Sequence, residues 1–241
     1  MWVLQTSIRM LMHPKSGERL TLLSMHHLGD SAYFKNVEAA IRKVDFVVLE
    51  GWDDLDPSKL HPELHWIYRY QRVSAKLLNL TLQSDWQRGV RDVKFIRADL
   101  PLDEIAAFMD KESIKIFPKE WKDYVAKLEN YDLKRGGDES LARIQGGLFK
   151  SWLDDAKALL KDPRANAMDK LTSMRDEAIW RKLKGLLSRD PAKNIAIQYG
   201  ALHNWTLEPR LVKELGFICE SSSWIDVFGV DESALGAPQK K

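Results

Sequence analysis

The chain has 241 residues, of which 44% are hydrophobic and 30% are charged, as in an ordinary globular protein with room for one large domain. Its formal net charge is only +2, and interspersed basic and acidic residues leave no electrostatic footprint for nucleic acid or an anionic membrane. The single cysteine, Cys219, excludes an internal disulfide and fits a reducing compartment.

The amino-terminal residues are apolar but lack a basic start, and Arg9 interrupts them before they reach the length of a signal-peptide core. No other apolar stretch approaches the roughly 20 residues that cross a bilayer. We therefore expect a cytoplasmic protein without an integral membrane segment.

The first part of the chain alternates strands and a helix. Val3–Met12 and Arg19–Met25 are joined by polar turn residues, which predicts a hairpin. Apolar residues then recur at three- and four-residue steps over Ser31–Lys43, as in a helix. The Val-rich run Phe46–Glu50 is typical of a buried parallel strand, so a right-handed crossover is expected before it.

The middle of the chain is helical by pattern, and strands return near its end. Helices are predicted at Pro62–Leu82, from Leu100, and at Pro118–Leu133, Asp138–Leu160, Pro163–Ser188 and Glu208–Leu215; strands are predicted at Val93–Ile96, Ile195–Tyr199 and Phe217–Ser222. The order predicts an α/β fold, with a mixed central β-sheet, flanking helices and a helical cap-like middle segment. We expect one domain over residues 1–235, with the helical insert at about 100–190 and a flexible tail at 236–241.

Two of the predicted strands are followed by histidines. His26 and His27 follow one strand, and His203 follows another after Gly200 and two spacers. In open α/β sheets, ligands bind beyond the carboxyl ends of the strands. Each histidine alone also fits a plain strand end or, for His203, an N-cap or a loop ahead of the helix at Glu208.

A third strand ends on a carboxylate, Glu50. A carboxylate there either faces solvent or meets a cation, because burying it unpaired is costly. Two imidazoles and a carboxylate suit a divalent metal, which makes His27, Glu50 and His203 the candidate ligands. Asp30 is near enough to His27 in sequence to accept a hydrogen bond from its ring or to act as a ligand.

Arg175 lies at the margin of a predicted helix face. It either pairs in solvent with Asp176 or Glu177, or reaches the sheet end to clamp Glu50 or a substrate oxyanion. Asp99 also ends a strand, but the Leu-Pro that follows it is equally typical of a helix entry. His61 and His65 have a metal-compatible spacing, yet without the intervening glutamate of a zinc protease they are expected in a core or on a surface.

Four of these segments together resemble one known family. Gly200–His203 and Ser24–His27 look like its two GxxH motifs, with Ser24 in place of the first glycine, while Val47–Glu50 looks like its glutamate strand and Met174–Glu177 like its arginine helix. The chain therefore resembles the TraB/Tiki group of the erythromycin esterase and ChaN-like superfamily, from about Leu22 to Phe217.

The resemblance implies an α/β fold with one polar site at the sheet end. For the Tiki branch it also implies metal-dependent cleavage of peptide bonds. On this interpretation His27 and His203 hold Mn²⁺, Co²⁺ or Zn²⁺, and Glu50 completes the ligands or acts as general base. Arg175 stabilises the oxyanion and Asp30 orients an imidazole, and Tyr199 is expected behind the ligands as a second supporting residue.

Two alternatives stay open, because members of the superfamily differ in activity. In one, the same residues form a metal-independent, esterase-like hydrolase with His27 or His203 as general base. In the other, the cleft captures a peptide or haem without turnover, with Tyr199 and the histidines as iron ligands. The expected partner is a peptide or small-molecule substrate.

Overall fold

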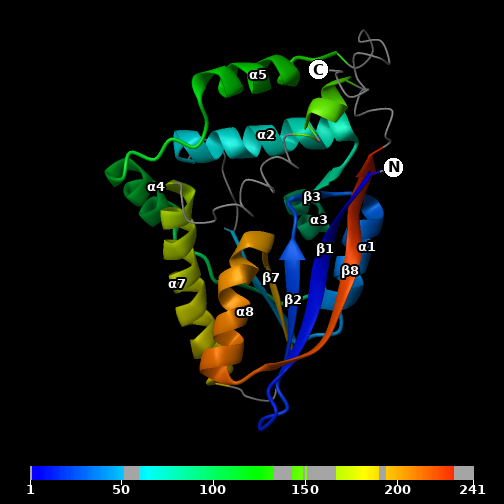
Figure 1. Cartoon of the computed structure of the whole chain (residues 1–241), viewed down its shortest axis with the longest axis vertical. Coiled ribbons are helices and arrows are strands. Elements are labelled where there is room, and N and C mark those ends of the chain that lie inside the picture. The colour runs from blue at the N-terminus through cyan, green and yellow to red at the C-terminus, as the bar shows by residue number, and fades with distance from the viewer. Residues whose placement is uncertain are drawn as a thin grey trace, which may run out of the picture.

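The computed structural model describes residues 2–51, 60–132, 143–148, 150, 167–189 and 194–230. Around its main sheet, the chain has the mixed α/β architecture that the sequence predicts (Figure 1). The six strands lie in the order β6-β4-β7-β2-β1-β8. Their bounds are β1 Trp2–Met12, β2 Arg19–Met25, β4 Phe46–Leu49, β6 Phe95–Arg97, β7 Asn194–Gly200 and β8 Ile218–Val230.

The strand register brings the ends of the parallel strands level. β1 and β2 form the expected antiparallel hairpin, whereas β2 pairs in parallel with β7, and β4 pairs in parallel with both β7 and β6. Leu49 is the Cα partner of Gln198 and of Arg97, and Met25 is the partner of Gly200. Residues that follow these strands are therefore delivered to one edge of the sheet.

Helices cover both faces of the sheet. Helix α1 (Ser31–Ile41) packs on one face, and α7 (Ala167–Leu187) and α8 (Ala201–Leu215) pack on the other (Figure 1). Alternate residues of β4 therefore face different cores: Val47 joins the α1 side and Val48 the α7–α8 side. All four residues of β4 are buried, as the Val-rich run predicts.

Further helices lie above the carboxyl ends of the parallel strands (Figure 1). They are α2 (Pro62–Leu78) and α5 (Lys119–Glu129), with α4 (Leu102–Lys111) beside α7. Aromatic side chains join α2 to α5, with the Tyr70 and Trp121 rings 4.7 Å apart between centroids. The cap-like layer thus includes α2, which precedes the range 100–190. Most of the helix predicted over Asp138–Leu160, and the tail at 236–241, lie outside the described residues.

Several predicted elements have different bounds. The helix predicted to reach Leu82 ends at Leu78, because Asn79 takes a left-handed conformation (φ 52°), and β5 (Thr81–Leu82) and α3 (Gln83–Gly89) follow. β5 pairs with the two-residue β3 (Leu28–Gly29) in a second small sheet. β8 runs to Val230 because it pairs along the whole of β1.

Helix α8 also differs in its bounds, and this difference matters for the site. The sequence pattern places this helix at Glu208–Leu215. The structure begins it at Ala201, with Pro209 inside the helix. His203 therefore lies on the first turn of α8, not in a loop ahead of it. No described helix is long and apolar enough to cross a membrane.

Candidate functional site

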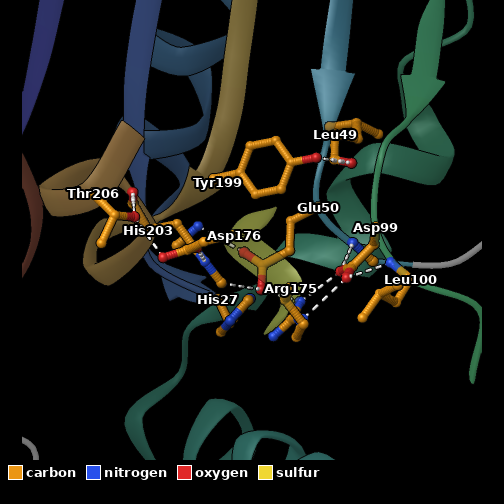
Figure 2. Close-up of polar contacts among 12 residues, drawn as sticks. His27, Leu49, Glu50, Asp99, Leu100, Arg175, Asp176, Tyr199, His203 and Thr206 are labelled. Carbon is orange, nitrogen blue, oxygen red and sulfur yellow. Dashed lines mark hydrogen bonds and ion pairs between the residues drawn. The ribbon is translucent and has the colours of Figure 1, made fainter. Parts of the chain in front are cut away.

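Glu50 is the centre of a polar cluster at the carboxyl ends of β4 and β7 (Figure 2). Its backbone N–H donates to the Gln198 carbonyl at 3.1 Å, which continues the strand pairing by one residue. Its side chain is 9% exposed. Oε2 accepts from the Gly200 N–H at 2.6 Å, and Oε1 accepts from Arg175 Nη2 at 2.7 Å. The carboxylate at the strand end is thus buried and paired with a cation.

Arg175 bridges Glu50 to a second carboxylate, Asp99. Its Nε donates to Asp99 Oδ1 at 3.0 Å and its Nη2 to Oδ2 at 2.5 Å, the two-point geometry that guanidinium and carboxylate favour. The Asp99 side chain is 1% exposed and also accepts from the backbone N–H groups of Gly51 and Leu100, each at 2.9 Å. Asp99 therefore belongs to the site, although the Leu-Pro that follows it in the sequence is equally typical of a helix entry.

His203 lies between two carboxylates. Its Nδ1 hydrogen-bonds to Oδ1 of Asp176, and its Nε2 lies 3.4 Å from Oε1 of Glu50. Asp176 is held in turn, because the Thr206 hydroxyl donates to its other oxygen at 2.5 Å. The Tyr199 ring packs edge-on against the imidazole, with 5.8 Å between centroids. The ring of His203 is therefore fixed from several sides.

His27 lies beside this pair in Figure 2 and contributes to the electrostatic field at Glu50. Its Nδ1 is 3.1 Å from Oε1 of Gln83, and the Gln83 backbone N–H donates to the His27 carbonyl at 2.9 Å. Because the amide oxygen only accepts, Nδ1 carries the proton in the neutral ring. The Nε2 atom of neutral His27 is therefore left with its lone pair.

The two residues expected to support the histidines have other contacts. Asp30 is the N-cap of α1, where its Oδ1 accepts from the Tyr33 N–H at 2.7 Å, and the side chain that contacts the His27 ring is Gln83. Tyr199 is fully buried and donates its hydroxyl to the Leu49 carbonyl at 2.9 Å, so it supports His203 by packing alone. That hydroxyl is not free to serve as an iron ligand.

The charges in the cluster shift the pKa values of its members. Burial disfavours the ionised form of Glu50, but the charges of Arg175 and then His203 outweigh it and hold the pKa of this carboxyl well below its usual range. Burial alone would lower the pKa of His203, whereas the charge of Glu50 and the hydrogen bond to Asp176 raise it to about 9. In this arrangement the imidazolium of His203 and the guanidinium of Arg175 compensate the buried carboxylates.

The donor atoms decide whether these residues fit a divalent ion. His203 and His27 each have one ring nitrogen held by a side-chain oxygen, as metal-binding histidines do, so each would bind an ion through Nε2. Glu50 offers a carboxylate beside them. Among the described residues, no three His, Cys, Asp or Glu side chains are arranged as a complete set of metal ligands. The fit is therefore one of donor chemistry, centred on the His203–Glu50 pair.

Two functional contacts were missed in the sequence. Asp176 is 4% exposed and lies on the same helix face as the buried residues Ile179, Trp180 and Leu183. A carboxylate within such an apolar stripe could have identified Asp176 from the sequence. Gln83 gave no comparable signal, because a short helix that the sequence did not predict carries it to His27.

Fold and site together define a mixed α/β protein with a buried, charge-compensated cluster at the carboxyl ends of its parallel strands. Compared with protein-family models, curated proteins and solved structures, the chain matches none of them. A function for it is therefore argued from the cluster itself.

Proposed function

We propose that the protein is a metal-dependent hydrolase that cleaves peptide bonds at this cluster. The observation that carries the proposal is the pair of imidazoles whose Nδ1 atoms contact Asp176 and Gln83. Such contacts fix the tautomer of a metal-binding histidine and raise its basicity. The resemblance of these segments to the TraB/Tiki group supports the same activity.

His27, His203 and Glu50 would hold the ion, with Mn²⁺, Co²⁺ and Zn²⁺ as the candidates. Two ligand atoms of one tetrahedral Zn²⁺ lie about 3.4 Å apart when each is about 2.1 Å from the metal. The His203 Nε2 and Glu50 Oε1 atoms have that separation, 3.4 Å. When bound, such an ion lowers the pKa of its water towards about 7.

The chain's own residues would prepare this site. Arg175 keeps Glu50 ionised, so that the carboxylate is ready to bind a cation or accept a proton. Asp176 holds the ring of His203 against rotation. Because the Nε and Nη2 atoms of Arg175 face carboxylates, we assign it this positioning role instead of the oxyanion contact that the sequence suggested.

A metal-independent hydrolase is the second candidate, because one observation favours it. Gln83 accepts at Nδ1 of His27 and leaves Nε2 of the neutral ring as a proton acceptor. That atom would act as general base on water, with an ester as substrate. Glu50 and the imidazolium of His203 would then supply the charges around the reacting group.

One set of variants separates the two candidates. Peptide and ester cleavage and bound metal are measured for the wild type, His203→Ala and His27→Ala, with and without chelator. His13→Ala is the matched control, because His13 lies just after β1 in the hairpin turn, at the opposite end of β2 from His27. We expect loss of metal and of peptide cleavage in His203→Ala and full retention in the control.

If metal content and activity both survive in His203→Ala, the metal-dependent proposal is wrong. Chelator-resistant ester cleavage that is lost in His27→Ala would support the second candidate instead.

We further propose that the protein acts in the cytoplasm on a peptide or small-molecule substrate. Cys219, the single cysteine, is an exposed free thiol on β8, which persists most readily in a reducing compartment. Cell fractionation tests this placement, and recovery from an oxidising compartment would contradict it.

A further inference from the structure

A pocket lies on the α8 side of the sheet, next to the candidate site. It has a volume of about 550 Å³ and is bounded by α8 and by strands β1, β2 and β8. Figure 1 shows α8 beside β7 and β2, with β1 and β8 on the other side of β2. The outer strands thus form a floor and the helix forms a wall.

The floor of this pocket is polar. Ser7 of β1 and Ser24 of β2 lie on it, with their hydroxyl oxygens 3.2 Å apart. Asn204 of α8 donates from Nδ2 to the Ser24 hydroxyl at 2.9 Å. Ser24 is the residue that stands in place of a motif glycine, and its hydroxyl contributes to this network.

Two polar atoms of residues that line the pocket are shielded from solvent and lack a partner among the described residues. One is an acceptor, Oδ1 of Asn204, whose residue is 5% exposed. The other is a donor, Nε of Arg9, whose Nη1 is occupied by Glu208 at 2.6 Å. Buried polar atoms are costly when unpaired, so an occupant with both a donor and an acceptor is favoured. A peptide group carries one of each.

Two tryptophans give the same pocket an apolar surface. Trp205 of α8 is 49% exposed and Trp224 of β8 is 66% exposed, although large aromatic side chains are usually mostly buried. Pro209 and Val212 lie on the wall with them. Exposed aromatic rings beside unpaired polar atoms are typical of ligand sites, where the rings supply contact area and the polar atoms fix orientation.

The pocket adjoins the cluster around Glu50 through the chain itself. Asn204 directly follows His203, and His26 directly precedes His27. Consecutive Cα atoms are about 3.8 Å apart, so the pocket and the cluster lie close together along these two segments.

We propose that this pocket binds a peptide segment through one backbone amide and one large apolar or aromatic side chain. Once the Asn204 and Arg9 side chains turn these two atoms toward the pocket, the amide N–H would donate to Asn204 Oδ1 and its carbonyl would accept from Arg9 Nε. The side chain of the segment would lie against Trp205 and Trp224. For its role in cleavage the inference rests on the proposed function, since the pocket would then select the substrate. Binding itself does not depend on turnover.

The test uses N-acetyl-phenylalanine methylamide and the full chain with chelator present, so that no cleavage occurs. Affinity is measured by ligand-observed NMR. The variants are Asn204→Leu, which removes the acceptor, and Trp224→Ala, whose side chain is too exposed to be needed for folding. Ile218→Ala is the matched control, because this residue is 48% exposed on the same strand and does not line the pocket.

We expect affinity to fall at least tenfold in both pocket variants and to stay unchanged in the control. Equal affinity in the wild type and Trp224→Ala would overturn the proposal, even if Asn204→Leu failed to fold. Binding of N-acetylglucosamine but not of the peptide probe would also overturn it, since a sugar would then be the occupant. If the probe binds but the metal-loaded protein, assayed without chelator, cleaves no peptide, only the proposed function is contradicted.

Discussion

The Nε2 atom of His203 and the Oε1 atom of Glu50 lie 3.4 Å apart, although they belong to distant parts of the chain. The parallel pairing of β4 with β7 places Glu50 beside Gly200, and the start of α8 at Ala201 then brings His203 back over the strand end. The two atoms face each other across a gap that a proton or a metal ion would fill. The residues that hold these two side chains in place, Asp176 for His203 and Arg175 for Glu50, should therefore determine the charge state and the ion binding of the site.

Asp176→Asn removes the charge that holds His203. We expect the pKa of His203 to fall from about 9, because one of the groups that raises it is lost. Loss of a contact of this kind typically costs 10- to 100-fold in metal affinity or activity. NMR titration of the imidazole and a metal-binding assay measure the two effects.

The neighbouring carboxylate supplies the control. Glu177 has a 59% exposed side chain and pairs with Arg210 on the surface. Glu177→Gln should leave the pKa of His203 and the metal affinity unchanged. If both variants behaved alike, Asp176 would not be the group that sets the state of His203.

Arg175→Gln should destabilise the fold strongly. It leaves Glu50 and Asp99 as buried carboxylates without their shared cation, and breaking a buried ion pair in this way typically costs about 3–5 kcal/mol. Urea unfolding gives the free energy. Arg181→Gln, on the exposed side of the same helix, should change it by less than about 0.5 kcal/mol. A similar loss in both variants would show that Arg175 is not held as described.

Much of this arrangement could be predicted from local sequence patterns. Apolar runs predicted β2, β4 and β7, and Glu50 and His203 were identified as candidates because each follows such a run. In an α/β sheet, parallel strand ends meet at one edge, so even the meeting of these two residues could be expected.

The supporting contacts could not be predicted, because they depend on how the helices pack. Asp176 and Gln83 reach the histidines only once α7 lies against α8 and once α3 follows β5. The need for glycine at position 200 also depends on packing. Its φ of −49° is open to any residue, so it is not needed for the turn, and what requires glycine is the approach of Glu50.

Gly200→Ala tests that approach. An added Cβ would lie 3.1 Å from Oε2 of Glu50, closer than ordinary van der Waals contact, and would push the carboxylate from the Gly200 N–H. Overpacking at such a site typically costs about 1–3 kcal/mol. Gly185→Ala is the reference, because nothing lies within 4 Å of the added atom inside α7. That change should stabilise the helix by about 0.5–1 kcal/mol. Thermal unfolding of both variants checks the opposite signs.

Stability at alkaline pH provides the last prediction, for protein kept free of metal by a chelator. The pKa of His203 is raised from 6.5 to about 9 on folding, by the charge of Glu50 and the hydrogen bond to Asp176 against the effect of burial. Below pH 6.5 both states hold the proton and the stabilisation is complete. As the pH rises through about 9, the folded state also loses the proton and the stabilisation disappears.

The shift corresponds to a stabilisation on the order of 3 kcal/mol. His203→Gln removes the titrating ring, and all other titrating residues are the same in the wild type and the variant. The difference in unfolding free energy between wild type and variant should therefore be largest below pH 6.5 and should shrink as the pH approaches 9. Urea unfolding across this range measures it. A constant difference would mean that His203 does not hold its proton between Asp176 and Glu50.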